Sequence, residues 1–369
     1  MILQADPGRS FKALNEEIKN AVSKVLESGW YILGKENEIF EKAFANYHSA
    51  QFCLGAANGT DAIELILRAL DIGFGDKVAT VGNTASATVS AIERTGAQVR
   101  FADIEQDKFT MSPDSLDELL SAESGIKAVV VVHLFGAPAD LDKLLEVTQK
   151  HNVFLIEDCA QAHGAKYRGQ KCGTFGIAGS FSFYPTKNLG AFGDGGAVIT
   201  NNKKLYEKMT AIRQYGWKQR YISEFSGINS RLDEIQAAIL SVKLPSLDKN
   251  NAKRRQIAAY YRKNLTDVQE IILPVEPENT YHVYHQFVIR VINKKRESLM
   301  AYLKENSIGT AIHYPVAIPS QTGYKTIPKI CDLTETLKVN DEILSLPMYP
   351  ELTDSEVAEI ISKIRSFFK

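Results

Sequence analysis

Two side chains that could do chemistry together, Asp158 and Lys187, each follow an apolar run typical of a buried strand. The run VFLIED ends at Asp158, and a short polar turn after GSFSFY presents Lys187 ahead of a glycine-rich stretch. A lysine just beyond a buried strand can have its ammonium partly desolvated, which lowers its pKa and frees the amine to form a Schiff base. Both residues lie at the carboxyl ends of predicted strands, where open α/β sheets place their active sites.

A reactive lysine, together with an acid able to hold a pyridinium nitrogen, suggests pyridoxal 5'-phosphate (PLP) as the cofactor. A carboxylate beside that nitrogen keeps it protonated, so the ring can withdraw the electrons left when a substrate carbon loses its proton. Lys187, once displaced from the cofactor, would be the free amine that moves this proton. No GxGxxG joins a first strand to its helix, which argues against a nicotinamide-dependent dehydrogenase.

The elements that must position these residues follow from alternating apolar and helical patterns. Seven strands are predicted, at 52–56, 77–81, 98–103, 127–134, 153–158, 179–184 and 196–200. Helical patterns between several of them, such as 60–71 and 112–122, predict a mostly parallel α/β sheet covered on both faces. The character changes after about residue 245. We therefore predict a large domain over 1–245 and a smaller C-terminal α+β domain over 246–369.

Bulk properties narrow the class of protein further. The 43 basic and 44 acidic residues leave a net charge of −1, so we expect no nucleic acid and no membrane as a partner. The four cysteines form no CxxC pair, which argues against a disulfide framework or a metal site and fits a reducing cytoplasm. The first residues lack a secretion-signal layout. We expect a soluble cytoplasmic enzyme.

Six motifs then occur along the chain: SGWYILGKE (28–36), ANGTDAIELILRAL (57–70), EDCAQAHGA (157–165), SFYPTKNLGAFGDGGAV (182–198), YGWKQRYISEFSGINSRLDEIQAAIL (215–240) and HYP (313–315). In their order and content they resemble the DegT/DnrJ/EryC/StrS group of PLP-dependent nucleotide-sugar aminotransferases. The resemblance implies a fold-type-I transferase, similar to aspartate aminotransferase, that works as a homodimer with its active site at the subunit interface. It also implies an amino-acid donor, glutamate, and a nucleotide-linked ketosugar as the acceptor.

The resemblance assigns cofactor contacts to particular residues. Lys187 carries PLP, Asp158 binds the pyridine nitrogen, and Gln161 touches the ring hydroxyl. Gly59 and Thr60 open a predicted helix, whose free N–H groups and partial positive charge suit a phosphate.

Two further phosphate ligands are implied by the resemblance. One is Ser182, which binds the phosphate in its own subunit. The other is Asn229, which reaches the phosphate of the neighbouring subunit. On the residues alone, Gln161 could be an ordinary loop amide, and Asn58 or Thr60 could be plain helix caps. His163 fits a structural histidine better than a base.

The same resemblance offers candidates for binding the sugar nucleotide: Tyr31, Tyr184, Lys218, Arg220, Tyr221, His313 and Tyr314. Arginine grips phosphate through two donors, and tyrosine can orient sugar oxygens. The alternative for the basic residues is a solvated face, and Tyr31 could equally be packing. Many relatives stack an aromatic residue on the cofactor ring where this chain has Ala85.

The motifs YGWKQRY and HYP are most similar to those of enzymes that aminate C3 of a dTDP-3-keto-6-deoxyhexose, for surface polysaccharides such as O-antigen. Transfer would follow a ping-pong order in which the cofactor alternates between PLP and its amine form, PMP. The alternatives are a 4-aminotransferase and a regulatory or binding protein without turnover. Related sugar dehydratases replace the lysine by histidine, so Lys187 argues against that activity.

Overall fold

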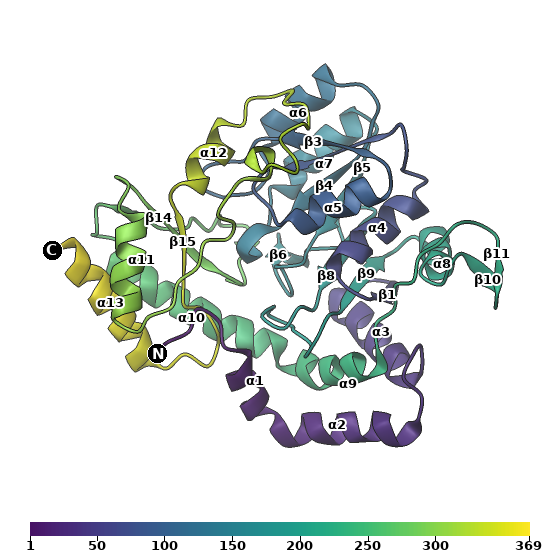
Figure 1. The fold of residues 1–369 in the computed structure, drawn as a ribbon, viewed down its shortest axis with the longest axis horizontal. Coiled ribbons are helices and arrows are strands. Elements are labelled where there is room, and N and C mark those ends of the chain that lie inside the picture. Colours follow the sequence, from purple (N-terminus) through teal and green to yellow (C-terminus); the bar gives the residue numbers. More distant parts are fainter.

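The computed structural model describes residues 1–369, and a seven-stranded sheet forms its centre (Figure 1). The strands are β1 (Phe52–Ala56), β2 (Lys77–Val81), β3 (Gln98–Ala102), β4 (Ile126–Val132), β5 (Phe154–Asp158), β8 (Ala178–Ser182) and β9 (Gly196–Thr200). They are ordered β1-β9-β8-β5-β4-β2-β3. Strand β9 runs antiparallel to both of its neighbours, and the other pairs are parallel. The predicted mostly parallel sheet is confirmed, with each strand close to its predicted position.

Both faces of the sheet are covered, as the apolar strands require. Along β4, Val129 and Val131 belong to one core of 44 buried residues, whereas Ala128 and Val130 belong to another of 26. This alternation follows from successive strand side chains pointing to opposite faces. The helices of this part are α3 (Lys35–His48), α4 (Gly59–Ala69), α5 (Ser86–Arg94), α6 (Pro113–Ala122), α7 (Leu141–Lys150), α8 (Lys203–Ile212) and α9 (Glu234–Lys243).

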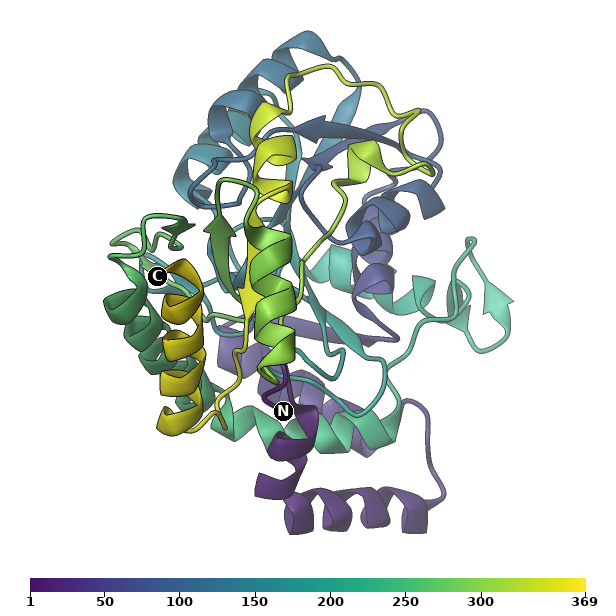
Figure 2. The ribbon, with the colours of Figure 1, turned by 60° about the vertical axis from the view of Figure 1, so that its left-hand side comes forward.

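A third core of 23 residues lies in the C-terminal part of the chain. It is built by α10 (Leu247–Leu265), α11 (Arg296–Glu305), α13 (Asp354–Phe368) and a small sheet of β12 (Ile271–Ile272), β14 (Phe287–Val291) and β15 (Ile343–Leu346). Ile2, at the other end of the chain, packs into the same core and bridges Ile308. The helices α1 (Pro7–Ala13) and α2 (Asn15–Ser28) then lead back along α9 (Figures 1 and 2). The domain division at residue 245 stays a prediction.

One C-terminal segment returns to the large sheet and helps to build the site. The N–H of Ile318, in the 3₁₀ turn η3 (Ile318–Ser320), donates to the carbonyl of Gly82 at 3.0 Å. Asp103, just after β3, accepts hydrogen bonds from the backbone N–H groups of Glu335 and Thr336 at 2.9 and 2.8 Å. These contacts cap the start of α12 (Thr334–Asn340), which otherwise has unpaired N–H groups. The HYP segment is thereby held on its C-terminal side, and a bridge between Ala311 and Ser345 holds it on the other side.

The remaining elements are short: β6 (Lys166–Tyr167), β7 (Gln170–Lys171), β10 (Trp217–Gln219), β11 (Ile222–Ser223), β13 (Thr280–Tyr281), η1 (Leu134–Gly136) and η2 (Leu244–Ser246). Strands β10 and β11 form a hairpin that projects from the body of the molecule (Figure 1). No helix of the structure is both long enough and apolar enough to cross a membrane.

Candidate active site

Eight of the predicted site residues line a single cavity at the carboxyl ends of the strands: Gly59, Thr60, Asp158, Gln161, Ser182, Tyr184, Lys187 and Tyr314. They come from four separate stretches of the chain, so the fold is what brings them together. The interior of this cavity is about 240 Å³, and it opens to solvent. Ala85 lines it as well, with Ala87, so the loop after β2 contributes small side chains and no aromatic ring.

Lys187 sits in a tight turn beyond β8, where its N–H donates to the carbonyl of Tyr184 at 2.9 Å. Burial lowers the pKa of its ammonium to about 8, although the negative charge of Asp158 acts in the opposite direction. At pH 7 about a tenth of the molecules therefore carry this amine uncharged, far more than for an ordinary lysine, as the sequence-based argument for a reactive lysine requires.

The loop that carries Lys187 is held from behind by α10. The Nδ2 of Asn188 donates to Oδ1 of Asn251 at 2.8 Å and to the carbonyl of Val283 at 3.0 Å. The Nδ2 of Asn251 donates in turn to the carbonyl of His163 at 2.8 Å. One buried amide thus ties the lysine loop to the loop that follows Asp158. This connection was not predicted from the sequence, because α10 lies in the part expected to form a separate domain.

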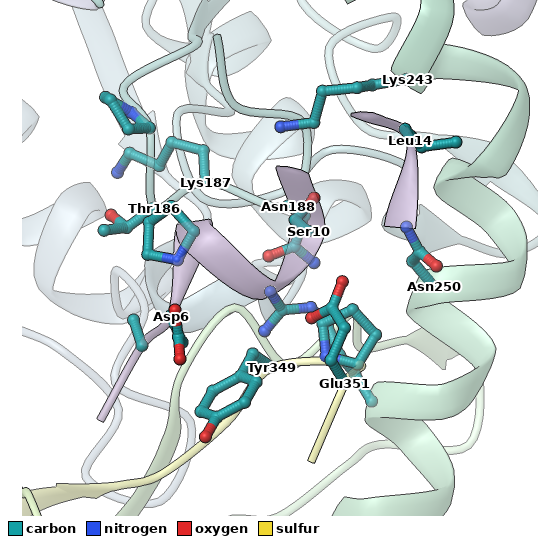
Figure 3. A pocket seen from close by; sticks show the side chains of 15 residues that line it. Asp6, Ser10, Leu14, Thr186, Lys187, Asn188, Lys243, Asn250, Tyr349 and Glu351 are labelled. Carbon is teal, nitrogen blue, oxygen red and sulfur yellow. The ribbon is translucent and has the colours of Figure 1, made fainter. Parts of the chain in front are cut away.

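A second cavity lies on the other side of the lysine loop (Figure 3). Asp6, Lys243, Arg254 and Glu351 are among the charged side chains around it. Its interior of about 40 Å³ has room for very few water molecules and none for an amino acid or a cofactor. In Figure 3 the Lys187 side chain extends away from this space. We call it the rear cavity, and the larger one the front cavity.

Asp158 ends β5 and is held at both carboxylate oxygens. Its Oδ1 accepts from the N–H of Ala160 at 3.0 Å, and its Oδ2 accepts from the hydroxyl of Thr88 at 2.9 Å. Thr84 lies 3.1 Å from Thr88, oxygen to oxygen, and lines the front cavity. Neither threonine was predicted from the sequence to belong to the site. The only signal was their spacing of four at the start of a helix, which puts them on one face.

A cradle for a phosphate is formed by the start of α4 and the end of β8. The Oδ1 of Asn58 accepts from the N–H of Asp61 at 2.8 Å, so Asn58 is a helix cap. A side-chain carbon on Gly59 would lie 2.7 Å from the Cβ of Ser182, so only glycine permits this approach. The first N–H groups of a helix have no partner within it. Here they accompany the hydroxyls of Thr60 and Ser182 in the same cavity.

Gln161 joins the loop after β5 to the HYP segment. Its Oε1 accepts from the N–H of Phe135 at 2.6 Å, and its Nε2 donates to the hydroxyl of Tyr314 at 3.1 Å. Burial raises the pKa of Tyr314 to about 12, so this hydroxyl stays protonated. Burial, followed by the charge of Lys187, lowers the pKa of His313 to about 4. A neutral His313, bonded through Nδ1 to the Ser345 hydroxyl at 2.9 Å, therefore stands near the lysine.

Besides His313, the predicted residues that do not line the cavity of this chain are Tyr31, Lys218, Arg220, Tyr221 and Asn229. Lys218 pairs with Glu224 at 2.8 Å, and the Arg220 guanidinium lies over the ring of Tyr221 at 4.9 Å. The Tyr31 hydroxyl donates to the carbonyl of Leu26 at 3.3 Å. These residues are placed on the β10–β11 hairpin, beside it, or in the loop after α2.

His163 does not face the cavity either. It is completely buried, and its ring lies against Phe181 and Phe183 with centroids 5.6 and 5.8 Å apart. Burial lowers its pKa well below the usual range. This environment agrees with a structural histidine.

The donor set of the front cavity fits pyridoxal phosphate. It offers an amine with a lowered pKa, a carboxylate whose two oxygens are already oriented, and a helix start flanked by two hydroxyls. These are the groups needed to attach an aldehyde, to hold a protonated ring nitrogen and to bind a phosphate. The rear cavity is too small, and the helix start in its wall, at Pro7, is already capped by the side chain of Asp6.

Comparison with known proteins agrees with this chemistry. Residues 12–365 match the DegT/DnrJ/EryC1/StrS aminotransferase family. The chain belongs to this family. Membership confirms the predicted aminotransferase activity and the predicted pyridoxal phosphate cofactor.

Three similar proteins illustrate the family. The dTDP-3-amino-3,6-dideoxy-α-D-galactopyranose transaminase of Aneurinibacillus thermoaerophilus is 43% identical over 352 residues, which cover 95% of each chain. A pleiotropic regulatory protein of Geobacillus stearothermophilus is 40% identical over 367 residues, 99% of this chain and 98% of its own. The crystal structure of S. venezuelae DesV in complex with a ketimine intermediate has 37% identity and a TM-score of 0.95, covering 100% of this chain and 98% of DesV. The predicted fold-type-I class is confirmed.

Proposed function

We propose that this aminotransferase moves an amino group from L-glutamate to C3 of a dTDP-3-keto-6-deoxyhexose. The products are 2-oxoglutarate and a dTDP-3-amino-3,6-dideoxyhexose, so one amine and one carbonyl exchange places without an external oxidant. The observation that carries the proposal is the front cavity, where Lys187 and Asp158 meet beside a phosphate cradle. The substrate rests on the 43% identity to a transaminase whose name specifies a 3-amino-3,6-dideoxy sugar. No relative described above favours the 4-amino alternative.

Pyridoxal phosphate, when bound, supplies the electron sink that stabilises a carbanion on the substrate. Lys187 attaches the cofactor and, as a free amine, carries the proton to and from the reacting carbon. Asp158 holds the proton on the ring nitrogen. Gly59, Thr60 and Ser182 would receive the phosphate, and Gln161 has one amide N–H left that would be available to the ring hydroxyl. Tyr184 and Tyr314 line the same cavity and orient the sugar.

We propose a homodimer whose interface uses exposed apolar side chains near the predicted substrate residues. Trp30 is 64% exposed, Tyr221 71% and Ile222 56%, and large apolar side chains grouped on a surface mark interaction sites. The loop after α2 and the β10–β11 hairpin project from the same side of the molecule (Figures 1 and 2). We propose that this side meets a second copy, so that Asn229, Lys218, Arg220, Tyr221 and Tyr31 complete the partner's cavity. The four free, buried cysteines suit the reducing cytoplasm as the place of action.

The substrate is tested by offering glutamate with a panel of nucleotide ketosugars. The panel varies the nucleotide and the carbonyl position, and mass spectrometry and NMR identify each product. We expect turnover with the dTDP-3-keto-6-deoxyhexose and a product aminated at C3. Amination at C4, or preference for a UDP-linked sugar, would overturn the substrate while leaving the aminotransferase chemistry intact.

The shared site is tested by mixing two inactive variants, Lys187→Ala and Asn229→Asp, under conditions that exchange subunits. If Asn229 acts in the neighbouring subunit, each mixed dimer contains one site with both residues native. Random exchange then restores roughly a quarter of the native activity. No recovery, together with a single-chain mass in light scattering, would contradict the proposed dimer.

A further inference from the structure

Two threonine hydroxyls lead to Asp158, and counting their protons shows which of them donates in each hydrogen bond. An aspartate carboxylate only accepts hydrogen bonds, so the contact of 2.9 Å from Thr88 must be a donation by the threonine. A hydroxyl has one proton, and that of Thr88 is now committed. In the contact of 3.1 Å between Thr84 and Thr88, Thr84 must therefore be the donor. Thr84 thus donates to Thr88, and Thr88 donates to Asp158. The Thr84 oxygen has only lone pairs left to present to the cavity.

These two residues belong to the start of a different element from Asp158. Thr84 precedes α5 and Thr88 lies in its first turns, whereas Asp158 ends β5. Both threonines are nearly completely buried, at 2% and 1% exposure. A buried hydroxyl must find a partner, so packing and hydrogen bonding together fix where the Thr88 proton points.

The consequence is an acid with a preset orientation. The N–H of Ala160 holds Oδ1 from the chain that follows Asp158, and Thr88 holds Oδ2 from α5. A carboxylate bound at both oxygens by two separate elements cannot rotate freely about its terminal torsion. Its remaining lone pairs therefore face the front cavity before any cofactor arrives, which removes an ordering cost from binding.

We propose that Thr88, supported by Thr84, is a positioning residue that holds the Asp158 carboxylate in the orientation needed to receive the pyridine nitrogen. It acts through Asp158 and does not itself touch the substrate. A hydrogen bond to a charged group contributes more than one between neutral groups, so its loss is measurable in cofactor binding.

The test is Thr88→Val, which removes the hydroxyl and keeps the shape. The dissociation constant of PLP from the apo-protein, measured by fluorescence titration, is expected to rise about 10- to 100-fold. Thr88→Ser restores a hydroxyl and is expected to bind within about threefold of the native protein. Thr84→Ala removes the second hydroxyl of the pair, so a smaller rise of about threefold is expected.

The matched control is Thr80→Val. Thr80 is completely buried in β2, and its hydroxyl donates to the carbonyl of Val130 at 3.0 Å. This substitution has the same chemistry and comparable burial, but no contact with Asp158. We expect it to lower the melting temperature of the apo-protein as Thr88→Val does, with PLP affinity unchanged.

The proposal is overturned if Thr88→Val binds PLP as tightly as Thr80→Val does, or if Thr88→Ser binds as weakly as Thr88→Val. Should Thr88→Val fail to fold, Thr84→Ala decides the matter: unchanged PLP affinity would remove the pair from the site. A second readout is the pH dependence of the absorbance of the bound cofactor, which shifts if the partner of the ring nitrogen is misoriented. A purely structural threonine would leave that profile in place.

Discussion

The front and rear cavities share one loop and contain two lysines whose pKa values are almost the same. Burial lowers the pKa of Lys187 to about 8, and it lowers that of Lys243 to about 8 as well. Each cavity also contains a carboxylate, Asp158 in front and Glu351 behind. By the criterion of a perturbed lysine alone, the two sites are equivalent.

What separates them is how the other groups are arranged. Lys243 donates to the carbonyl of Gly190 and lies near the ring of Phe192, so its ammonium is already bound. Burial raises the pKa of Glu351, whereas Asp158 is held at both oxygens beside an open cavity. A lowered lysine pKa therefore follows from burial in both places. Only the front cavity adds a preset acid, a phosphate cradle and room for a cofactor.

The largest effect is expected when each lysine is removed in turn. Lys187→Ala should lower the rate of amino transfer at least about 10²- to 10⁴-fold, the usual contribution of a positioned proton-transfer group. Lys243→Met, its counterpart behind the loop, should cost stability because the carbonyl of Gly190 loses its donor, while transfer continues. Steady-state rates with glutamate and a ketosugar, together with thermal melting, measure both. Equal losses of rate in the two variants would break the distinction between the cavities.

Exchanging the acids for amides is the next largest expected effect. Asp158→Asn keeps the size of the side chain and removes the charge that protonates the ring nitrogen, so we expect about 10²-fold weaker PLP binding and slower transfer. Glu351→Gln makes the same change behind the loop and should leave both quantities near native. A titration of the apo-protein with PLP gives the affinities. If only Glu351→Gln bound PLP more weakly, the cofactor would have to bind in the rear cavity, and the assignment to the front cavity would be wrong.

A pair of glycine substitutions tests whether the start of α4 and Ser182 bind the phosphate. Gly59→Ala places a carbon 2.7 Å from the Cβ of Ser182, which must push α4 and β8 apart. We expect PLP affinity to fall about 10-fold or more, because the helix start no longer fits the phosphate. Gly323→Ala meets nothing within 4 Å and serves as the control. Unchanged affinity in both variants would mean that the phosphate binds elsewhere.

The pH dependence of the rate of PLP attachment compares the protonated and unprotonated forms of the Lys187 amine. Only the unprotonated amine attacks an aldehyde, and the pKa of Lys187 is about 8. The rate of PLP attachment to the apo-protein should therefore rise about tenfold per pH unit below 8 and level off above it. Stopped-flow absorbance between pH 6 and pH 9 records the profile. A rate still rising steeply at pH 9 would indicate an ordinary, solvated lysine.

The smallest expected effect concerns the exposed hairpin. Arg220→Ala should raise the KM for the nucleotide sugar about 10-fold and leave PLP affinity unchanged, because we propose that this guanidinium binds the phosphates of the sugar nucleotide in the partner's cavity and not the cofactor. Lys108→Ala, which removes a surface cation paired with Glu105 at 2.9 Å, is the control. A fall in kcat with no change in KM would contradict a role in substrate binding.

The sequence predicted most of what lies on the large sheet and less of what crosses between elements. The seven strands and the pair Asp158–Lys187 followed from apolar runs that end at polar residues, a pattern set by local burial. Thr88 escaped notice because its contact with Asp158 spans 70 residues, and no local pattern encodes such a contact. The same holds for Asn251, whose two amide contacts join three separate segments.

The predicted substrate residues fall into two groups, those at or beside the cavity and those on the exposed hairpin, and the division has a physical reason. Tyr184, Tyr314 and His313 are placed by elements that pack on the sheet, so a single chain brings them to or beside the cavity. Lys218, Arg220 and Tyr221 lie on an exposed hairpin. Motif resemblance indicated a role for them, but their position depends on what covers the hairpin, and one chain does not contain that information.

The central claim is that Lys187, and not Lys243, is the lysine that carries the cofactor. The most direct measurement is to load the native protein with PLP, reduce the covalent linkage with borohydride, digest, and map the modified peptide by mass spectrometry. The account predicts modification at Lys187 alone, in stoichiometric amount. Label on Lys243, or a protein that remains unmodified after loading, would contradict it.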